Sequence, residues 1–468
     1  MAVPAHEATT RHLGAAYPFA AERGLGTAGV LVGRDLLGGP FCYDPFLLYG
    51  EAAITNPNMV VFGQIGRGKS AFVKTYLWRQ AVFGRKAWVV DPKGEYGALA
   101  RAFGTRPMSL RPGGSIRLNP LDSPAMAAGV PEREVTRRRA ELLASLATAS
   151  LGRLLLPTER AAIELAVAEV SDRLGHRGSR PTGVSAHRCG DTTRAPTLPE
   201  VVDALLRPSA RAARALCTDV AGLASDGRNV ALELRRLVSG DLAGMFDGPT
   251  SPGVSFDGPF VVLDLSAVYH SAALGVLMTC ATAWLQAGLM VGGTNEGCTE
   301  DGRANSDLAH ARENTILVVD EAWAILANLG VARWLQSAWK LSRAWGVSNV
   351  AVLHRVSDLS ATGSAGSEQV GLAQGLLADS ETRVLYGQAP GEVDLAAALL
   401  GLSSTEAELV PHLRRGVALW KVGGRSFLVE HRLASHEGPL VDTDGQMTES
   451  SYEPSRVTHV TAASRQAP

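Results

Sequence analysis

The sequence predicts an α/β fold built on a mostly parallel sheet, and three observations support this prediction. Short runs of large apolar and β-branched residues recur along the chain, and helical stretches separate most of these runs. Strands that alternate with helices are typical of parallel sheets, because each helix returns the chain to the start of the next strand. Hydrophobic residues make up 46% of the chain and charged residues 19%, which is enough apolar material for a sizeable core.

The expected strands are short and lie on both sides of a long central region. Apolar runs bounded by Gly or polar residues indicate them. In chain order they lie at 59–63, 86–91, 260–266, 315–322, 347–354 and 381–388, followed by GVALWKV and RSFLVEHRL. A stretch with helical apolar spacing, 70–83, follows the first strand.

The same pattern divides the chain into regions. The central region 98–257 is rich in Ala, Leu and Arg, so we expect a mostly helical insertion. The stretches 51–97 and 258–433 then form the α/β core. Residues 1–50 hold apolar runs broken by Gly and Pro, which predict a short segment of small strands and irregular structure. Residues 434–468 are polar and are expected to form a disordered tail.

Charge and cysteine content exclude some classes of protein. The formal net charge is −1, so the whole molecule lacks the basic footprint of many nucleic-acid-binding proteins, although a local basic pore remains compatible with it. The five cysteines form no CxxC pair and no zinc spacing, which indicates reduced cysteines in a cytoplasmic protein. The uncharged stretch 271–293 is long enough to span a bilayer. Its Ala and Gly content and its place after a strand favour a buried helix instead, so we expect no transmembrane segment.

The most specific motif is GQIGRGKS at 63–70, which fits G-x-x-x-x-G-K-[ST] between a strand and a helix. The glycines let the backbone N–H groups turn toward phosphate oxygens, and the helix N-terminus adds its positive dipole end. Lys69 would reach the β- and γ-phosphates, and Ser70 would bind Mg²⁺. The residues expected to bind nucleotide are Gly63, Gln64, Ile65, Gly66, Arg67, Gly68, Lys69, Ser70 and Ala71.

A phosphate loop needs a carboxylate on a nearby strand end, and TILVVDEAW supplies one. The apolar run 316–319 suits a strand buried on both faces, which places Asp320 at its carboxyl end, where ligands bind in open α/β sheets. We expect Asp320 to hold the Mg²⁺ and Glu321 to polarise the attacking water. Adjacent acids favour hydrolysis over transfer to a second substrate. No guanine-reading N/T-K-x-D motif occurs, so ATP is favoured over GTP.

Two further sets of residues are candidates for the site. DPKGEYG follows the strand at 86–91 and places Asp91, Lys93 and Glu95 at the edge of the sheet that holds the phosphate loop, as a contact with the active site, a subunit interface or a polar turn. Phosphoryl transfer also needs positive charge on the γ-phosphate, often from a neighbouring subunit. Arg343 and Arg383 are the candidates for this arginine finger, with Arg415 as a third.

The order of these motifs resembles the ATPases of the HerA/FtsK superfamily. The shared set is GQIGRGKS, DPKGEY, NPLD, FDGPT, VVLDLS, LVVDEAW and a terminal LRRG. Within the superfamily the set looks most like the TraC/TrbE-type transfer ATPases of conjugation and type IV secretion, of an actinobacterial kind. The resemblance covers 39–436, and DEAW and FDGPT are its more specific pieces.

This resemblance implies a P-loop ATPase with a RecA-like core and an all-α insertion, assembled as a homo-hexamer with nucleotide between the subunits. It places the protein in the cytoplasm, peripheral to the inner membrane, where it would contact the channel proteins of a type IV secretion system. The cofactors would be ATP and Mg²⁺. Hydrolysis would energise channel assembly or the transfer of DNA or protein.

Two departures from the family pattern qualify the resemblance. Members usually carry a large N-terminal domain that docks on the channel, whereas about fifty residues precede the phosphate loop here, so a separate protein would provide docking. Members also usually have Gln at the end of the strand after TILVVDEAW, where it senses the γ-phosphate. Here His354 occupies that place, either as the sensor or as a structural histidine at a strand end.

Two alternative functions stay open. A soluble DNA translocase or helicase of the HerA/FtsK kind is compatible with the motifs, and DNA-stimulated hydrolysis with a steep salt dependence would favour it. A nucleotide-binding scaffold that hydrolyses little is the other alternative. The intact set of Lys69, Ser70, Asp320 and Glu321 argues against the scaffold.

Overall fold

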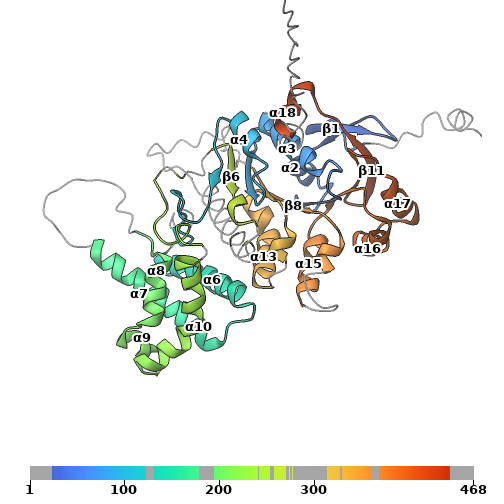
Figure 1. Cartoon of the computed structure of the whole chain (residues 1–468). Coiled ribbons are helices and arrows are strands. Elements are labelled where there is room, and N and C mark those ends of the chain that lie inside the picture. The colour runs from blue at the N-terminus through green and yellow to red at the C-terminus, as the bar shows by residue number, and fades with distance from the viewer. Residues whose placement is uncertain are drawn as a thin grey trace, which may run out of the picture.

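The structure is a computed structural model of the 468-residue chain (Figure 1). It describes residues 24–122, 131–178, 194–240, 242–252, 254, 258–269, 274, 277, 314–326, 329–360 and 368–442. Within these residues one sheet of eleven strands forms the centre of the molecule.

The sheet has the order β2-β1-β11-β10-β9-β3-β8-β7-β4-β6-β5. The strands are β1 (Val30–Asp35), β2 (Pro40–Tyr43), β3 (Met59–Phe62), β4 (Lys86–Asp91), β5 (Met108–Ser109), β6 (Phe260–Asp264), β7 (Thr315–Val319), β8 (Val347–Leu353), β9 (Thr382–Tyr386), β10 (Val417–Val422) and β11 (Arg425–His431). The pairings from β9 through β3 to β5 are parallel, and those from β9 through β10 to β2 are antiparallel. The predicted α/β fold with a mostly parallel sheet is therefore confirmed.

Helices cover both faces of the sheet, so alternate residues of each strand enter different cores. On β3, Met59 and Val61 face a cluster that includes α3, whereas Val60 and Phe62 face a second cluster that includes α13 and α15. Both faces are apolar because both are covered. The helices of this part are α2 (Pro45–Gly50), α3 (Lys69–Gln80), α4 (Gly97–Ala102), α12 (Trp323–Leu326), α13 (Leu329–Trp345), α14 (Ser357–Ser360), α15 (Glu368–Ala378), α16 (Val393–Leu400), α17 (Ser404–Leu409) and α18 (Gly438–Val441).

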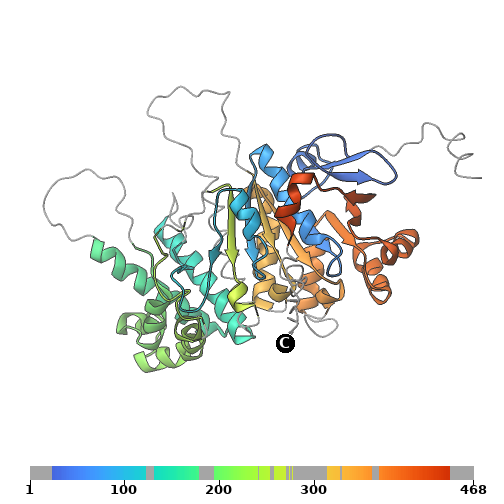
Figure 2. The same cartoon turned by 45° about the horizontal axis from the view of Figure 1, so that its top comes forward.

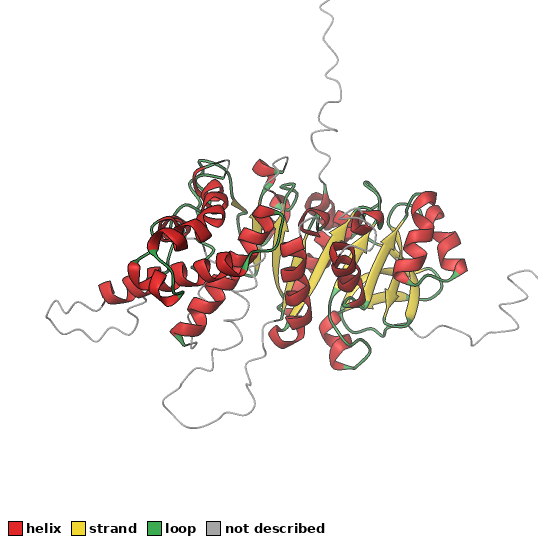
Figure 3. Ribbon diagram, turned by 90° about the horizontal axis from the view of Figure 1, so that it is seen from below, coloured by secondary structure: helices red, strands yellow, loops and turns green. Residues whose placement is uncertain are grey.

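A group of helices stands beside the β6–β5 edge of the sheet, as Figures 1 and 2 both show. Its members are α6 (Glu132–Leu151), α7 (Pro157–Gly178), α8 (Leu198–Leu206), α9 (Ala210–Ala215) and α10 (Val220–Ser239). They pack on one another, and α6 also packs against α13. Figure 3 shows this group at one end of the molecule, where it contains no strand among its described residues.

The observed elements shift several expected boundaries. α4 and β5 lie at the start of the region expected as a helical insertion, but β5 pairs with β6, so this stretch belongs to the sheet. At the N-terminus, β1 and β2 join the same sheet through β11. Residues 1–23 of the expected N-terminal segment lie outside the described residues.

The expected disordered tail starts too early at 434. The chain continues through α18, which packs on α3 and α4, because the buried carboxylate of Glu437 pairs with Arg79. Leu440 lies against the core. The remainder, 443–468, lies outside the described residues.

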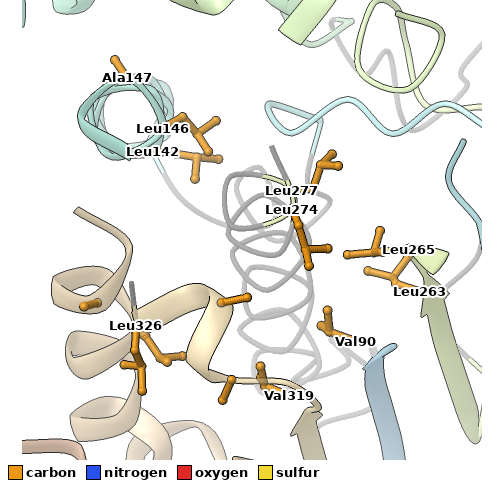
Figure 4. Packing of buried hydrophobic residues seen from close by; sticks show 14 of the residues in the cluster. Val90, Leu142, Leu146, Ala147, Leu263, Leu265, Leu274, Leu277, Val319 and Leu326 are labelled. Atoms are coloured by element: carbon orange, nitrogen blue, oxygen red, sulfur yellow. The ribbon is translucent and has the colours of Figure 1, made fainter. Parts of the chain in front are cut away.

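Of the stretch 271–293, the structure describes Leu274 and Leu277. Both are buried, and Figure 4 shows them between α6 and the strands that carry Val90 and Leu263. Their burial agrees with the expectation of a helix packed on the sheet, although most of the stretch lies outside the described residues. No helix in the described part of the chain is long and apolar enough to cross a membrane.

Candidate nucleotide-binding site

The expected phosphate loop connects β3 to α3, and its glycines are required by its geometry. Gly66 and Gly68 have positive φ angles of 76° and 111°, which side chains rarely adopt. A Cβ atom on Gly63 would lie 2.5 Å from Cβ of Tyr386 on the adjacent strand β9. Gly68 is the N-cap of α3 and provides no side-chain capping bond, so the first-turn N–H groups keep their capacity for an anion. The loop therefore fits a bound phosphate group.

Segments from the antiparallel side of the sheet hold this loop in place. The N–H of Gln64 donates to the carbonyl of Gly387 at 3.4 Å. The Arg67 guanidinium donates to the carbonyl of Leu413 at 3.2 Å, and the Arg67 carbonyl accepts from the N–H of Gly416 at 2.9 Å. Ile65, at the tip of the loop, is 81% exposed. Arg67 is thus an anchor of the loop.

Lys69 is buried and bonded within its own loop. Its Nζ donates to the carbonyls of Gly63 and Gln64, the latter at 3.1 Å. The same Nζ lies 3.3 Å from Nδ1 of His354. Burial lowers the pKa of Lys69 to about 8, although the carboxylates of Asp320 and Glu321 act in the opposite direction. An anionic phosphate at the loop would further favour the charged form of this lysine.

Asp320 follows β7 and is buried at the carboxyl edge of the sheet, where the sequence placed it. The hydroxyl of Tyr96 donates to its Oδ2 at 3.4 Å, and the N–H of Glu321 donates to its Oδ1 at 3.0 Å. Burial, followed by the charges of Glu321 and Asp91, raises the pKa of Asp320 to about 7. A divalent cation would relieve this crowding of negative charge.

Ser70 lies in the first turn of α3, on the loop that follows β3. Within the described residues, no group of three or more His, Cys, Asp or Glu side chains could hold a metal ion by itself. A site of one hydroxyl and one carboxylate suits Mg²⁺, which usually takes few protein ligands and completes its shell with water and substrate phosphates. Ser70 and Asp320 therefore fit Mg²⁺ that arrives with a nucleotide.

Glu321 is held in place by three side chains and by an uncommon backbone conformation. Its φ is +51°, a left-handed conformation that is uncommon outside glycine. Its Oε1 accepts from Nε2 of His354 at 2.6 Å and pairs with Nζ of Lys93, and its Oε2 accepts from the indole N–H of Trp323. Burial by itself raises the pKa of Glu321, but the bonds from His354 and Lys93 outweigh burial and lower it to about 2.

His354 directly follows β8 and links the lysine of the loop to this acid. Because Lys69 donates to Nδ1, the proton of the imidazole lies on Nε2, from which it is shared with Glu321. The structure thus brings Lys69, His354 and Glu321, all predicted from the sequence, into one hydrogen-bonded chain. β8 lies between β3 and β7, which explains how one residue can bridge both partners.

The DPKGEYG turn adds Lys93, whose role the sequence left open between several alternatives. Asp91 fixes the turn, since its carboxylate accepts from the N–H groups of Lys93, Gly94 and Tyr96 at 3.1, 2.8 and 2.9 Å. The turn directs Lys93 toward Glu321. The sequence signal was the placement of this lysine after the strand at 86–91, and the structure adds that this strand, β4, pairs with β7.

Lys74, on the second turn of α3, received no role from the sequence. Its side chain is fully buried, and its Nζ lies 3.8 Å from Glu95 and 5.4 Å from the centre of the Tyr96 ring. Burial lowers its pKa, while Glu95, Asp91 and Asp320 oppose that shift. A lysine on a helix gives no pattern that would have revealed this position.

Arg383 and Arg343, two of the arginines expected as fingers, lie away from their own phosphate loop. Arg383, on β9, donates to the carbonyls of Leu377, Ser380 and Leu400 at 3.1 to 3.2 Å. A guanidinium bonded to three carbonyls of its own subunit is not free to reach a phosphate, so the structure gives Arg383 a structural role instead.

Arg343 is exposed in the last turn of α13 and makes one long bond, to the carbonyl of Thr55 at 3.4 Å. Since α13 leads into β8, Arg343 lies at the opposite edge of the sheet from His354. It could act only on the site of a neighbouring subunit. Arg415 is exposed in the segment that anchors the phosphate loop.

Several solved structures share this architecture. VirB4 of Thermoanaerobacter pseudethanolicus matches with a TM-score of 0.66 at 22% identity, over 89% of this chain and 99% of that chain. The bacterial conjugative coupling protein TrwBΔN70, in a form with sulphate, matches with a TM-score of 0.54 at 14% identity, over 88% and 90%. TrwB in complex with ADP and Mg²⁺ matches with a TM-score of 0.51 at 16% identity, over 89% and 92%.

No protein-family model matches the sequence, and no curated protein matches it. The structural similarity establishes that the chain shares the α/β fold of VirB4 and TrwB, and the predicted RecA-like core is confirmed in this sense.

Proposed function

We propose that this chain is an ATP-hydrolysing motor subunit of a conjugative or type IV secretion-like system. The observation that carries the proposal is the connected set of Lys69, His354 and Glu321 at the carboxyl edge of the sheet, beside a phosphate loop with an uncapped helix N-terminus. The similarity to VirB4 over 89% of the chain supports the choice of system.

The residues would divide the work of hydrolysis as follows. The N–H groups at the start of α3 and the ammonium of Lys69 would bind the phosphates. Ser70 and Asp320 would hold Mg²⁺, which supplies charge neutralisation at the phosphates. Glu321 would orient the attacking water. His354 would hold the Glu321 carboxylate in place and connect it to Lys69.

The larger assembly is proposed from the resemblance. A homo-hexamer would place Arg343 of one subunit at the nucleotide of the next, since Arg343 lies far from its own site. The helices α6 to α10 would form the all-α insertion of the motor. The assembly would work in the cytoplasm at the inner membrane, against the channel proteins of the secretion system.

The test is Mg²⁺-dependent ATP hydrolysis by the purified chain, with Lys69→Ala, Glu321→Gln and the exposed Lys340→Ala as matched control. We expect losses of at least about a hundredfold in the first two variants and none in the control. Glu321→Gln should still bind ATP. Absence of hydrolysis by the wild type at concentrations that form rings would contradict the motor and favour the scaffold.

A second candidate, a soluble DNA translocase, draws support from the similarity to the coupling protein TrwB. Single- and double-stranded DNA added to the same assay distinguish the two. Hydrolysis that DNA leaves unchanged favours a motor for channel assembly. A many-fold rise that disappears steeply with salt would place the translocase first.

A further inference from the structure

Lys93 is placed between the catalytic acid and solvent. Its side chain is 26% exposed, whereas the Glu321 carboxylate that it pairs with is 2% exposed. The turn that carries Lys93 is rigid, because Asp91 accepts three main-chain N–H groups and Gly94 has a φ of +74° that suits glycine. An incoming ligand would therefore meet the Lys93 ammonium at the entrance to Glu321.

The two lysines flank one imidazole ring. Nζ of Lys69 lies 3.3 Å from Nδ1 of His354, and Nζ of Lys93 lies 3.3 Å from Nε2 of the same ring. Because Nε2 gives its proton to Glu321, the bond that holds Lys93 is the one to the carboxylate. Both ammonium groups thus lie against the ring of His354, one on each side, and both are bonded to groups of the protein.

We propose that Lys93 is a second lysine ligand of the terminal phosphate. In the nucleotide-free protein, the Lys93 ammonium is instead paired with the Glu321 carboxylate. The inference rests on the proposed function, since it assigns a further residue to the same nucleotide site. Binding of a nucleoside triphosphate would draw the Lys93 ammonium from Glu321 to the γ-phosphate. The Glu321 Oε1 atom, which would still accept from His354, would then have a second lone pair available for the attacking water.

The charges at this edge support the exchange. Four carboxylates, Asp91, Glu95, Asp320 and Glu321, lie close to three lysines, Lys69, Lys74 and Lys93. A terminal phosphate carries more negative charge and more acceptor atoms than one carboxylate, so it competes well for a mobile ammonium. Lys74 is fully buried and cannot take this part. A diphosphate, which lacks the terminal group, would leave Lys93 on Glu321.

Binding affinity tests this inference without hydrolysis. The affinities for ADP and for an ATP analogue with a non-hydrolysable β,γ-imido bridge are measured with Mg²⁺ for the wild type, Lys93→Met, Lys93→Arg and the exposed control Lys340→Met. We expect Lys93→Met to weaken binding of the analogue by at least about tenfold and binding of ADP by less than about twofold. Lys93→Arg should retain most of the wild-type difference in affinity between the ATP analogue and ADP, because arginine keeps the positive charge.

Equal weakening of both nucleotides, or no weakening of the analogue, would overturn the role of Lys93 while leaving the wild type a nucleotide-binding protein. A wild type that binds neither nucleotide would instead remove the proposed function, and this inference with it. Lys340→Met should bind both nucleotides with wild-type affinity. This control shows whether the loss of any exposed lysine, and not of Lys93 in particular, weakens binding.

Discussion

His354 and Glu321 stand at the ends of adjacent parallel strands, and the imidazole donates its Nε2 proton to the carboxylate at 2.6 Å. The other ring nitrogen accepts from Lys69 of the phosphate loop. A movement of Lys69 in the phosphate loop would therefore be transmitted to the Glu321 carboxylate through the imidazole ring of His354.

Replacement of His354 tests the link directly. His354→Ala should lower kcat by about ten- to a hundredfold with little change in KM, because Glu321 loses the donor that orients it. His354→Gln keeps a donor at this place and should retain more activity than His354→Ala. Steady-state kinetics of both variants decide the matter, and an unchanged kcat in His354→Ala would assign the histidine a structural role.

The close approach of Gly63 to β9 predicts a cost for any side chain there. In Gly63→Ala the new Cβ would lie 2.5 Å from Cβ of Tyr386, so the phosphate loop or β9 must shift. We expect a loss of about 1–3 kcal/mol of unfolding free energy, measured by urea denaturation, together with weaker nucleotide binding. Gly39→Ala, whose Cβ would meet nothing within 4 Å, is the control. Equal stability of the two variants would show that the loop gives way without strain.

The pairing of Arg79 with Glu437 predicts that α18 is part of the folded core. Glu437→Ala would leave the Arg79 guanidinium without its carboxylate partner and should cost about 2–3 kcal/mol in urea unfolding. Glu141→Ala removes an exposed pair with Arg137 and should change stability by less than about 0.5 kcal/mol. If both variants unfold at the same urea concentration, the C-terminal segment does not contribute to the fold.

The two arginines once expected as fingers should behave differently. Arg383→Met removes a guanidinium bonded to three carbonyls and should lower stability by about 2 kcal/mol, with activity falling only as the folded fraction falls. Arg343→Ala should leave stability within about 0.5 kcal/mol but lower kcat by about a hundredfold or more, if it acts on a neighbouring subunit. Thermal unfolding and steady-state kinetics on the same samples distinguish these effects. If Arg343→Ala lost stability and Arg383→Met lost activity without losing stability, Arg343 would be the structural residue and Arg383 the finger.

The buried ring of His431 predicts a pH dependence of stability. Burial, with a smaller contribution from Arg79, lowers its pKa from 6.5 to about 4. The neutral form is thus favoured in the folded state, so its contribution is complete above pH 6.5 and is lost as pH falls toward 4. Between pH 7.5 and 4.5 the loss is about 2.5 kcal/mol.

Urea unfolding of the wild type beside His431→Gln isolates this contribution, because other groups titrate in both proteins. The stability advantage of the wild type should shrink by about that amount as pH falls from 7.5 to 4.5. A constant difference across this range would show that His431 titrates alike in the folded and unfolded states. The experiment probes the burial of the ring, whose Nε2 atom lies 2.9 Å from Oγ1 of Thr75.

Much of the site was predictable because the chemistry of phosphate binding fixes residue types at fixed spacings. The loop at 63–70 and the acids at 320 and 321 lie where a strand, a turn and a helix must place them. His354 followed from the resemblance, because it stands at the strand end where family members usually carry Gln. These residues belong to local patterns, which a sequence displays directly.

Other features depend on contacts between distant segments and could not be read in this way. The pairing of Lys93 with Glu321 joins residues 228 positions apart in sequence number, and only the neighbouring positions of β4 and β7 bring them together. The burial of Lys74 depends on Tyr96 packing over it. The structural role of Arg383 depends on how the carbonyls of Leu377 and Ser380, just before β9, and of Leu400, at the end of α16, converge on its guanidinium.

The anchoring of Arg67 has a mechanical meaning. Its side chain and its carbonyl hold residues just before β10, a strand that continues by hydrogen bonds through β11 to β1 at the outer side of the molecule. A force applied to that outer side would be transmitted across the hydrogen-bonded strands to the phosphate loop. The conformation of this loop determines how phosphates bind. The antiparallel strands would then transmit movement to the nucleotide site, with Arg67 as the connection between β10 and the phosphate loop.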